Sequence, residues 1–469
     1  MHVSPPPGAF QGHHAIVIGA SISGLLAARV LSAHFDRVTL FDRDTLPGSV
    51  ADRKGVPQGR HGHGLLASGL QGLKRLFPTL ERELLEAGAV SGDVIGDVRW
   101  FQHGHYKAKF RSGVGGLLLS RPLLEGTVRR QVMRLPNVTI TSGTHVLGLV
   151  ARDGRVDGVR VQRGGADVES VMADVVVDAS GRASRSPEWL EEMGYERPAV
   201  EEVRVDLGYT TRTFRRRPGD LDGDSGAVLA PKPPREMRVG FMLAMEGERW
   251  IVSVGGWLGH HAPTDPRGYL EFARTLARPD IYEVIKDAEP LTDAVKYVFQ
   301  SNLRRRYDRL TKFPARYLVT GDALSSFNPL YGQGMSVATL EALALEECLH
   351  AAPSVEHLWR PFFKVAGRII ETPWTIAVGG DFAFEGVTGA RPTGTGLVNW
   401  YLDRVHRAAS TDRRVCRAFF DVANMLQPPA ALFQPALVAR VARQCIFPSS
   451  PRAEAPAVGT VPERMVETR

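Results

Sequence analysis

The sequence predicts an α/β protein in which a Rossmann-like dinucleotide-binding domain is combined with a second, sheet-rich domain. Residues 13–45 follow the order strand, glycine turn, helix and strand, which is the β–α–β unit of dinucleotide-binding folds. Residues 316–348 again show an apolar strand followed by a helix. Between them, residues 200–300 show the alternation of apolar and polar side chains that indicates half-buried strands.

The turn after the first strand has the small residues that a pyrophosphate site requires. Gly19 permits a tight turn, Ser21 lets the backbone approach a phosphate, and Gly24 lets the helix pack close to its strand. The free N–H groups at the helix start favour an anion. The second strand ends at Asp42, 18 residues after Gly24, near the spacing of about 20 at which a carboxylate accepts from a ribose hydroxyl. The alternative is a tight strand-to-helix turn of an ordinary α/β protein, since Ser21 replaces the usual middle glycine.

Length and composition indicate a globular protein. A chain of 469 residues can bury a large core and hold two or three domains. Hydrophobic residues make up 43% and charged residues 23%, which is ordinary for a soluble protein. No apolar run reaches the roughly 18 residues that a membrane span needs. Residues 1–12 are polar and do not resemble a signal peptide.

The cysteines indicate the redox compartment of the protein, and the net charge limits the classes of partner it can bind. The three cysteines, Cys348, Cys416 and Cys445, are far apart and lack metal-site spacing, so no disulfide framework is expected and a cytoplasmic location is predicted. The net charge is +7, but no concentrated basic arm or zinc-finger spacing indicates nucleic acid. An anionic substrate or carrier remains compatible with this charge.

Periodicity and turn residues predict the remaining elements of the first half. Regularly spaced leucines favour a helix near 64–88, and alternation favours strands within 94–119, including residues 106–110. Short strands are expected between 138 and 161, with Asp153-Gly154 as a hairpin turn.

The second half is predicted to end in helices. Residues 354–447 are mostly helical by period, with breaks expected at Pro373, Gly379-Gly380 and Pro428-Pro429. This region matches no motif; it either caps a pocket or mediates dimerisation.

Three separated segments resemble the FAD-dependent monooxygenase superfamily with the p-hydroxybenzoate hydroxylase-like fold. The first is the opening fingerprint that ends at Asp42. The second is the apolar strand and Asp-x-x-Gly turn of residues 175–182. The third is the Gly-Asp strand end and Pro-x-x-Gly-x-Gly helix start of residues 318–335. The basic segment 53–63 is similar to that of actinobacterial flavin epoxidases that act on polyketide polyenes during polyether assembly.

The resemblance implies a Rossmann-like FAD-binding domain of the glutathione-reductase type, a mixed β-sheet substrate domain and a C-terminal helical region. The expected boundaries are 13–95, 120–198 and 303–350 for the FAD-binding domain, 96–119 and 199–302 for the substrate domain, 351–447 for the helical region, and 448–469 for a disordered tail.

The same resemblance implies which residues hold FAD. The glycine turn would take the pyrophosphate, and Asp42 would take the adenosine ribose. Pro329 would lie near the ring face where oxygen reacts, and the helix start that follows it would stabilise negative charge on reduced flavin. The expected FAD-binding residues are Gly19, Ser21, Gly24, Asp42, Arg43, Arg53, Lys54, Arg121, Val146, Asp322, Pro329, Gly332, Gln333, Gly334 and Met335.

Several of these residues have structural alternatives. Arg43 is equally a solvated surface arginine, and Arg53 and Arg121 could pair with surface carboxylates instead of phosphate. Asp178 either orders nicotinamide and phosphate contacts or caps Ser180 and Arg182.

Two histidines invite a metal interpretation. His61 and His63 have a His-x-His spacing, but no neighbouring carboxylate or cysteine completes a ligand set. A structural or flavin-adjacent role is therefore favoured, and no metal is predicted.

The implied activity is oxygen insertion through a C4a-hydroperoxyflavin, most specifically epoxidation of an alkene in a polyketide or terpenoid intermediate of bacterial secondary metabolism. Because the cofactor carries this chemistry, no catalytic side chain is assigned. The alternatives are an aromatic hydroxylase, a flavin-dependent reductase of prenyl-type double bonds, and a cofactor-binding protein without turnover. A halogenase is disfavoured because no Trp-x-Trp-x-Ile-Pro stretch is present.

The expected partners are small molecules. O₂ is a co-substrate, and electrons come from NAD(P)H or from reduced flavin supplied by a partner reductase. The substrate is apolar or a polyene, either free or bound to a carrier. An apolar pocket would suit it. Six apolar residues either line this pocket or belong to the core: Trp100, Phe110, Phe241, Met242, Met245 and Trp257.

Overall fold

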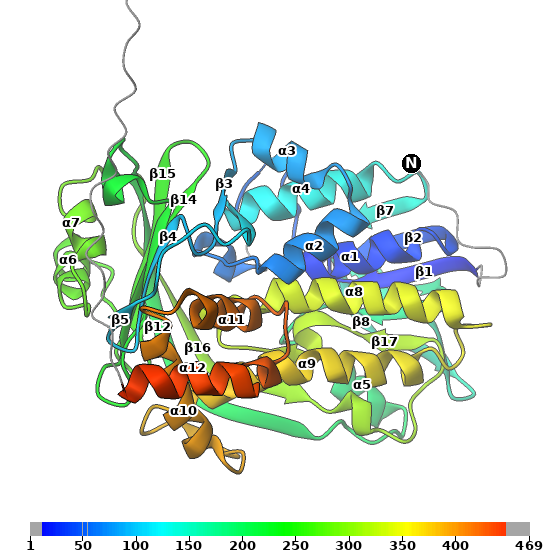
Figure 1. The fold of residues 1–469 in the computed structure, drawn as a ribbon. Helices are drawn as coiled ribbons and strands as arrows, with labels where there is room; N and C mark the ends of the chain where they lie inside the picture. The colour runs from blue at the N-terminus through cyan, green and yellow to red at the C-terminus, as the bar shows by residue number, and fades with distance from the viewer. Residues whose placement is uncertain (1–11, 49, 54, 447–469) are drawn as a thin grey trace, which may run out of the picture.

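The computed structural model describes residues 12–48, 50–53 and 55–446. Lys54 and the predicted tail at 448–469 lie outside these residues. Figure 1 shows a region with a parallel sheet and flanking helices beside a region dominated by one large sheet. The last helices of the chain (orange and red) lie in the lower middle of this view, beside the large sheet.

A parallel sheet brings together the three segments that resemble flavoenzymes. Among the described strands it has five members in the order β17-β11-β1-β2-β7, and all neighbouring pairs are parallel. Strands β11, β1 and β2 are rich in fully buried residues because helices cover the sheet. The carboxyl ends of parallel strands share one edge, which is where such sheets bind ligands. The bounds are β1 Gly12–Ile18, β2 Phe35–Phe41, β7 Val138–Thr141, β11 Val175–Asp178 and β17 Tyr317–Val319.

Helices and a small antiparallel sheet complete this region. Helix α1 (Ile22–Leu31) packs against α8 (Gly334–Ala351) and α4 (Arg121–Met133). The small sheet has the order β10-β9-β8. Asp153 and Gly154 both have positive φ between β8 and β9, which confirms the predicted hairpin. The bounds of the small sheet and of α5 are β8 Thr144–Arg152, β9 Arg155–Arg163, β10 Glu169–Met172 and α5 Ser186–Glu192.

The large sheet has nine strands among the described residues. Eight follow the order β18-β16-β12-β15-β14-β13-β4-β5, and β19 pairs with β12. The β13–β4 pair is parallel and the other pairs are antiparallel, so the sheet is mixed. One of its faces is covered by α6 (Pro266–Arg274) and α7 (Asp280–Ile285). The strand bounds are β4 Val98–Gln102, β5 His105–Tyr106, β12 Val200–Arg215, β13 Gly226–Leu229, β14 Arg238–Met245, β15 Arg249–Gly256, β16 Val295–Arg305, β18 Ser325–Ser326 and β19 Thr388–Gly389.

Two local predictions in the first half are wrong. The expected helix at 64–88 is divided into α2 (Ala67–Leu76) and α3 (Leu80–Glu86), because the residue before Pro78 is held out of the helical region. The expected strand at 106–110 ends at Tyr106. Beyond it the Ala108 amide donates to the Ala409 carbonyl at 2.9 Å, so the chain leaves the sheet to contact the C-terminal helices. A short pair of strands, β3 (Val90–Asp93) and β6 (Gly115–Leu118), precedes α4.

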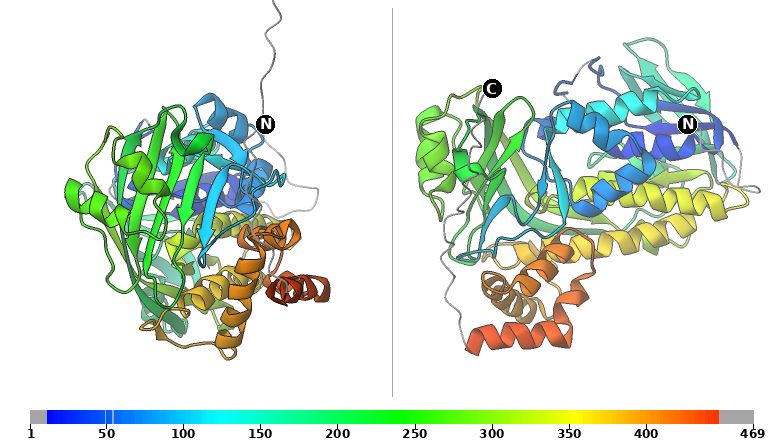
Figure 2. Two further views of the ribbon diagram at one scale, coloured as in Figure 1. Left: turned by 60° about the vertical axis from the view of Figure 1, so that its left-hand side comes forward. Right: turned by 45° about the horizontal axis from the view of Figure 1, so that its top comes forward.

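The C-terminal region is helical as expected, but its breaks differ. Helix α9 runs from Trp359 to Asp381 through both Pro373 and the Gly379-Gly380 pair, so the breaks predicted there are wrong. Burial of α9 against α8 offsets the cost of an internal proline, which is about 3 kcal/mol. The break at Pro428-Pro429 is confirmed, since α11 ends before it. Figure 2 shows the last three helices packed together: α10 Thr395–Ala408, α11 Arg413–Ala423 and α12 Pro435–Ile446.

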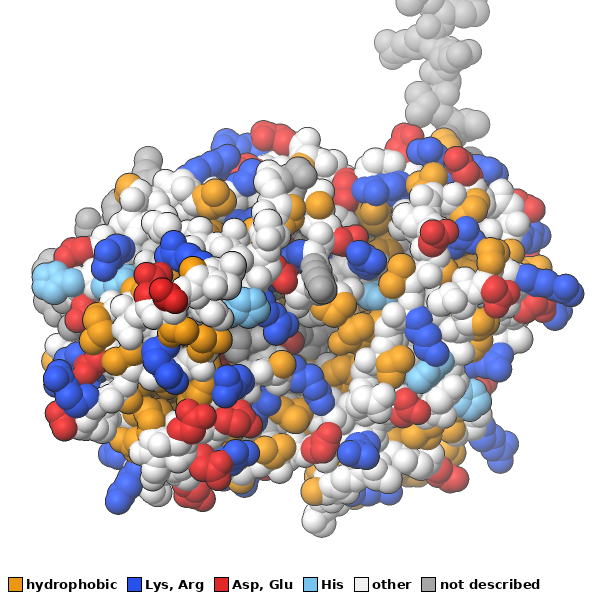
Figure 3. Space-filling model, turned by 180° about the vertical axis from the view of Figure 1, so that it is seen from behind, with side chains coloured by type: hydrophobic (Ala, Val, Ile, Leu, Met, Phe, Trp, Pro, Cys, Tyr) orange, Lys and Arg blue, Asp and Glu red, His pale blue; other side chains and the backbone are white. Residues whose placement is uncertain are grey.

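Surface properties agree with a globular protein. On the face shown in Figure 3, Lys and Arg side chains are interspersed with Asp and Glu, and no large patch of one charge is seen. In the part of the chain that the structure describes, no helix combines the length and the apolar character that crossing a bilayer requires.

Candidate cofactor site and cavity

The glycine turn is shaped as the sequence predicts. Gly19 has a φ of +99°, and a Cβ placed there would lie 2.6 Å from the Ala179 carbonyl oxygen. A Cβ on Gly24 would lie 1.9 Å from the Gly19 carbonyl oxygen. Only glycine fits at these two positions. The turn therefore places the start of α1 directly over the carboxyl ends of β1 and β11.

Asp42 is held against this turn at the end of β2. Its Oδ2 accepts from the Ala20 amide at 2.7 Å and from Nη2 of Arg53 at 3.1 Å, while its Oδ1 accepts from the Asp44 amide at 2.9 Å. The side chain is buried. Asp42 thus braces the glycine turn within the protein itself, and its predicted contact with a ribose stays a prediction.

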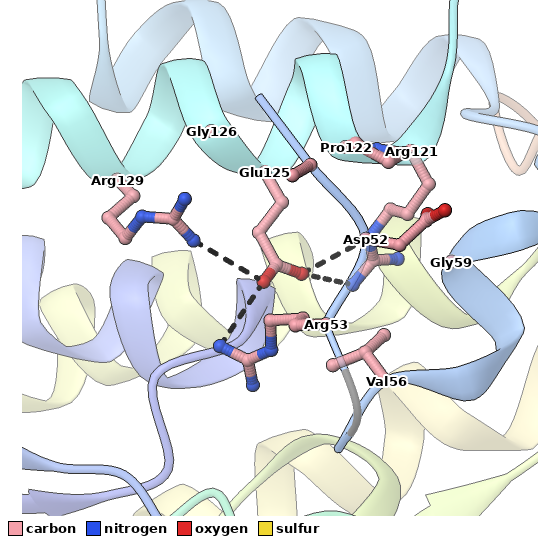
Figure 4. A pocket seen from close by; sticks show the side chains of 10 residues that line it. Asp52, Arg53, Val56, Gly59, Arg121, Pro122, Glu125, Gly126 and Arg129 are labelled. Carbon is pink, nitrogen blue, oxygen red and sulfur yellow. Dashed lines mark hydrogen bonds and ion pairs between the residues drawn. The ribbon is translucent and has the colours of Figure 1, made fainter. Parts of the chain in front are cut away.

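A buried charge network lies beside the turn (Figure 4). Oε2 of Glu125, on α4, accepts from Ser21 Oγ at 2.9 Å and from Arg121 Nη2 at 3.1 Å. Oε1 of Glu125 lies 3.4 Å from Arg53 Nη1 and 3.9 Å from Arg129 Nη1. Burial alone would raise the pKa of Glu125, but the two nearest arginines and Ser21 outweigh it and lower the pKa.

This network settles where the predicted arginines point. Arg53 and Arg121 pair with buried carboxylates of the site rather than with surface carboxylates, and both reach the glycine turn: Arg53 Nη1 donates to the Ala20 carbonyl oxygen and Arg121 Nη2 to Ser21 Oγ, each at 3.1 Å. Sequence reasoning missed Glu125. The signal for it was a carboxylate four residues after Arg121 on one helix face.

We expect Glu125→Gln to destabilise the apoprotein by about 3 kcal/mol, because it leaves buried arginines without their central counter-charge. Addition of FAD should restore most of this loss, since a pyrophosphate near Arg53 and Arg121 would replace the missing charge. Urea unfolding with and without FAD measures both values. Glu86→Gln, at an exposed i,i+4 pair, is the control and should change stability by less than about 0.5 kcal/mol. An equal loss in apo and FAD-loaded protein would contradict the placement of phosphate at these arginines.

Two predicted residues lie apart from the turn. Arg43 is exposed and belongs to no ion pair among the described residues, which agrees with the surface alternative. Val146 lies half-buried on β8. Their predicted roles near adenine stay predictions.

Asp322 follows β17 on a short turn that contacts α1. The preceding Gly321 has a φ of +68°, and a Cβ there would lie 2.5 Å from Ser23 Oγ. Burial raises the pKa of Asp322, with Arg121 and Arg182 acting in the opposite direction. Among the described residues no hydrogen bond to the Asp322 carboxylate is found. This acceptor is therefore wholly free for a ligand, whereas Asp42 already accepts three hydrogen bonds and has only part of its capacity left.

Glu341 fixes the position of the Asp322 turn and was not predicted. It lies on α8 with no exposed surface, and its Oε2 accepts from the Gly321 amide at 2.6 Å and from Thr320 Oγ1 at 2.8 Å. Burial raises the pKa of Glu341 to about 7. The signal in the sequence was a carboxylate among the apolar residues of the helix that follows Gly334.

The third motif forms the start of α8. Gly332 has a φ of +67°, and Gln333 is the N-cap residue of the helix. Oε1 of the buried Gln333 and Oγ of Ser23 at the start of α1 have no hydrogen-bond partner among the described residues. A Cβ on Gly64 would lie 3.4 Å from Gly332 Cα. The loop after His63 therefore adjoins the helix start, although the two are far apart in sequence.

A buried carboxylate, Asp381, anchors the turn in front of α8. Its oxygens accept from Trp257 Nε1 at 2.9 Å, Asn302 Nδ2 at 2.7 Å, Asn328 Nδ2 at 2.8 Å and Tyr331 OH at 3.3 Å. Burial raises the pKa of Asp381 to about 6, while these donors lower it. Sequence reasoning missed Asp381 because its partners come from three distant segments.

The Asp178 side chain makes structural contacts. It accepts from the Ser180 amide at 2.8 Å and Ser184 Oγ at 2.5 Å, and it also binds Ser186 Oγ. The predicted cap of Ser180 is thus present. The cap of Arg182 is not, because Arg182 Nη1 donates to the Ser301 carbonyl oxygen at 2.6 Å.

The two histidines of the basic segment also make protein contacts. His61 is buried, and its Nδ1 lies 2.7 Å from Thr211 Oγ1. His63 Nδ1 lies 2.9 Å from the His61 carbonyl oxygen. Burial lowers the pKa of His61 to about 4 and that of His63 to about 3. Within the described residues no group of three or more His, Cys, Asp or Glu side chains is arranged to hold a metal ion.

A cavity of about 1130 Å³ extends from the start of α8 between the large sheet and the C-terminal helices. Residues of α10 and α11 line it, so the C-terminal region caps this cavity. Trp100, Phe241 and Trp257 line it as expected. Met242 is instead buried on the opposite face of the sheet, and Met245 is buried on the face of Phe241 but outside the cavity. Phe110 packs against the C-terminal helices, so these three residues do not line the cavity. Strand alternation alone does not say which face of β14 meets the cavity, so Met242 was misplaced. It also does not say where along the strand the cavity ends, so Met245 was misplaced.

The residues present fit FAD. The glycine turn has room only for backbone, Asp322 offers an unused acceptor, and buried polar atoms of Ser23 and Gln333 lack protein partners at two helix starts. Helix starts favour anions and electron-rich groups. The predicted ring-binding edge, Gly332 to Met335, opens into the cavity through Gly332 and Gln333.

Three solved structures share this fold. PqsL, a probable FAD-dependent monooxygenase from Pseudomonas aeruginosa, has a TM-score of 0.58 at 17% identity, covering 79% of this chain and 98% of its own. A flavoprotein/dehydrogenase from Cytophaga hutchinsonii has a TM-score of 0.65 at 13% identity, covering 92% and 98%. A triple mutant of the flavin-dependent brominase Bmp2 has a TM-score of 0.62 at 14% identity, covering 92% and 98%. These likenesses show the fold.

The curated relatives add the family. The fold is the class of fold found in these flavin-dependent enzymes, among them a probable FAD-dependent monooxygenase. The chain belongs to the family of Protein Rv3254 of Mycobacterium tuberculosis, to which it is 33% identical over 431 residues, covering 85% of this chain and 86% of that protein. It is also 24% identical over 356 residues to Kynurenine 3-monooxygenase of Salinispora tropica, covering 72% and 73%. No family model matches the chain.

Proposed function

We propose that the protein is an FAD-dependent monooxygenase that epoxidises an alkene of a large, mainly apolar substrate such as a polyketide or terpenoid. The single observation that carries this proposal is the continuity of a dinucleotide cradle with a large apolar cavity. When bound, FAD supplies electron transfer from NAD(P)H and the activation of O₂. The protein supplies binding, orientation and a site from which water is excluded.

The roles of the residues follow from their positions. Gly19, Ser21 and Gly24 let the start of α1 approach the pyrophosphate, with Arg53 and Arg121 as counter-charges. Asp322 accepts from the ribityl hydroxyls. The start of α8 donates backbone N–H groups to the pyrimidine edge of the ring, and Pro329 lies toward its reactive face. Asp42 orients the adenosine ribose, and Arg43 and Val146 complete the adenosine side.

The size and lining of the cavity support a bulky apolar substrate. Ligand sites usually enclose about 300–1,000 Å³. This cavity of about 1130 Å³ is larger, so it has room for a bulky substrate in addition to the part that the flavin ring would fill. Aromatic and aliphatic side chains line the cavity from several elements, among them Phe241 on β14, Ile376 on α9 and Phe420 on α11. The second candidate is aromatic hydroxylation, which is favoured by the likeness to Kynurenine 3-monooxygenase.

The electron source is NAD(P)H bound transiently or a partner flavin reductase, because the sequence has one dinucleotide fingerprint. The substrate is free or presented on a carrier. The predicted cytoplasmic location suits both arrangements.

The test is isotope incorporation. The FAD-loaded protein, NADPH, a flavin reductase and ¹⁸O₂ are incubated with a linear polyene, squalene, or with kynurenine, and the products are analysed by mass spectrometry. The proposal predicts a squalene product that carries one ¹⁸O atom as an epoxide. Hydroxylated kynurenine would establish the second candidate instead. A reduced polyene without ¹⁸O would overturn both and indicate a reductase.

A further inference from the structure

One end of the cavity is polar. Gln102 and His103, at the end of β4, and Asp403 and His406, on α10, all line it. The rings of His103 and His406 stack with centroids 4.0 Å apart and planes at 9°. His103 Nδ1 lies 3.1 Å from Asp403 Oδ1. These four residues, the polar end, are therefore held in one fixed arrangement.

A buried lysine holds the two elements of the polar end together. Nζ of Lys107 donates to the carbonyl oxygens of Gln102 at 3.1 Å and His406 at 3.0 Å. Burial lowers the pKa of Lys107 to about 7. The polar end is thus built into the fold and is not an accidental meeting of surface side chains.

Two atoms of the polar end lack partners. Oε1 of Gln102 and Nδ1 of His406 are buried and have no hydrogen bond among the described residues. Two other polar residues that line the cavity have protein partners: Asp93 accepts from the Gly96 and Gly113 amides, and Asn399 donates to the Gly379 carbonyl. The unpartnered Oε1 of Gln333 lies at the proposed flavin edge instead. Buried polar atoms without partners are costly, so these two indicate a ligand group.

The chemistry of these atoms selects a hydroxyl group. Gln102 Oε1 needs a donor, which a hydroxyl provides and a carboxylate does not. Burial, together with the nearby Lys107 and His103, lowers the pKa of His406, so its ring is neutral. The carboxylate of Asp403, close by on α10, would repel an anionic group. A neutral group that donates and accepts satisfies the site.

The polar end and the proposed flavin edge lie at different places along the cavity. Gly332 adjoins Gly64, and Gly62 lies against Phe241 on β14. β14 is two strand spacings from β4, which ends at the polar end, and two spacings are roughly 10 Å. A ligand that reaches both places must therefore extend along the cavity.

We propose that the polar end binds a hydroxyl group of an elongated apolar substrate and so sets which double bond lies at the flavin. This inference rests on the proposed function, because that proposal identifies the molecule in the cavity as the substrate. Gln102 accepts from the hydroxyl and His406 hydrogen-bonds to it from the other side. The class of substrate is a long-chain or polyene alcohol rather than an acid.

The experiment is calorimetric titration of the FAD-loaded protein with decan-1-ol and with decanoate. The expected result is binding of decan-1-ol at least about tenfold tighter than that of decanoate, because one satisfied hydrogen bond contributes up to about 1.5 kcal/mol. Gln102→Met and His406→Phe should each remove most of this preference. Thr375→Val is the control: it removes a hydroxyl from an exposed residue of the cavity wall and should leave the preference unchanged.

Decanoate bound as tightly as decan-1-ol, or a preference that survives both substitutions, would overturn the inference. The wild-type comparison needs no variant, so misfolding of a variant does not obscure it. FAD content and NADPH-dependent O₂ uptake are measured on the same samples. Their absence would count against the proposed function, whereas the alcohol preference reports on the polar end separately.

Discussion

Gly24→Ala should reduce FAD affinity by about 10- to 100-fold. The new Cβ would lie 1.9 Å from the Gly19 carbonyl oxygen, which is backbone and cannot rotate away. Helix α1 must then move off β1, and an overpacked contact of this kind costs roughly 1–3 kcal/mol. The movement displaces the helix start that is proposed to meet the pyrophosphate. Titration of apoprotein with FAD, followed by flavin fluorescence, measures the change.

Gly396→Ala is the matched control for this substitution. Gly396 also lies in the first turn of a helix, α10, but nothing lies within 4 Å of a Cβ there. Its FAD affinity should equal that of the wild type. If Gly24→Ala bound FAD as well as Gly396→Ala did, the glycine turn would not be the pyrophosphate site.

Asp381→Val should destabilise the protein by about 3 kcal/mol or more and weaken FAD binding. Four buried donors lose their acceptor at once, and each buried donor left unpaired costs about 1–3 kcal/mol. Asn328 and Tyr331 belong to the turn that precedes α8, so the proposed ring-binding edge loses its anchor. Urea unfolding and FAD titration measure the two effects.

Asp293→Val is the control for stability, because Asp293 is exposed and surface changes usually stay within about 0.5 kcal/mol. Equal unfolding curves for the two variants would contradict the anchoring role of Asp381.

Asp381 also predicts a dependence of stability on pH. Its pKa is about 6 in the folded protein against a usual value of 3.8, so between these values the native state binds its proton and the unfolded state has lost it. The contribution of Asp381 to the free energy of unfolding therefore falls as pH rises through 6. Relative to Asp381→Asn, which does not titrate, the wild type should lose about 1 kcal/mol between pH 5 and pH 7. A constant difference across this range would contradict the raised pKa.

The parts of the site that follow a single strand could be predicted from the sequence. The glycine turn, Asp42 and Asp322 each lie at the end of an apolar strand, and parallel strands bring those ends to one edge. Each of these patterns consists of neighbouring residues, so the sequence shows it directly. The sheet order β17-β11-β1 then places the three segments side by side.

The parts that depend on contacts between distant segments could not be predicted. Glu125, Glu341 and Asp381 each hold a turn through hydrogen bonds to residues from other elements, and no spacing reveals such partners. The wrong breaks in α9 have the same origin, because tertiary burial of the helix outweighed the preferences of Pro373 and Gly379. Met242 was misplaced because the sequence does not show which face of β14 meets the cavity, and Met245 because it does not show where the cavity ends.

The central claim is that three remote segments form one cradle for FAD. Titration of the apoprotein with FAD, with FMN as comparison, tests it most directly. We predict saturation at one FAD per chain and much weaker binding of FMN, which lacks the adenosine half that Asp42 and the glycine turn are proposed to hold. A colourless protein that takes up no FAD, or one that binds FMN equally well, would contradict the account.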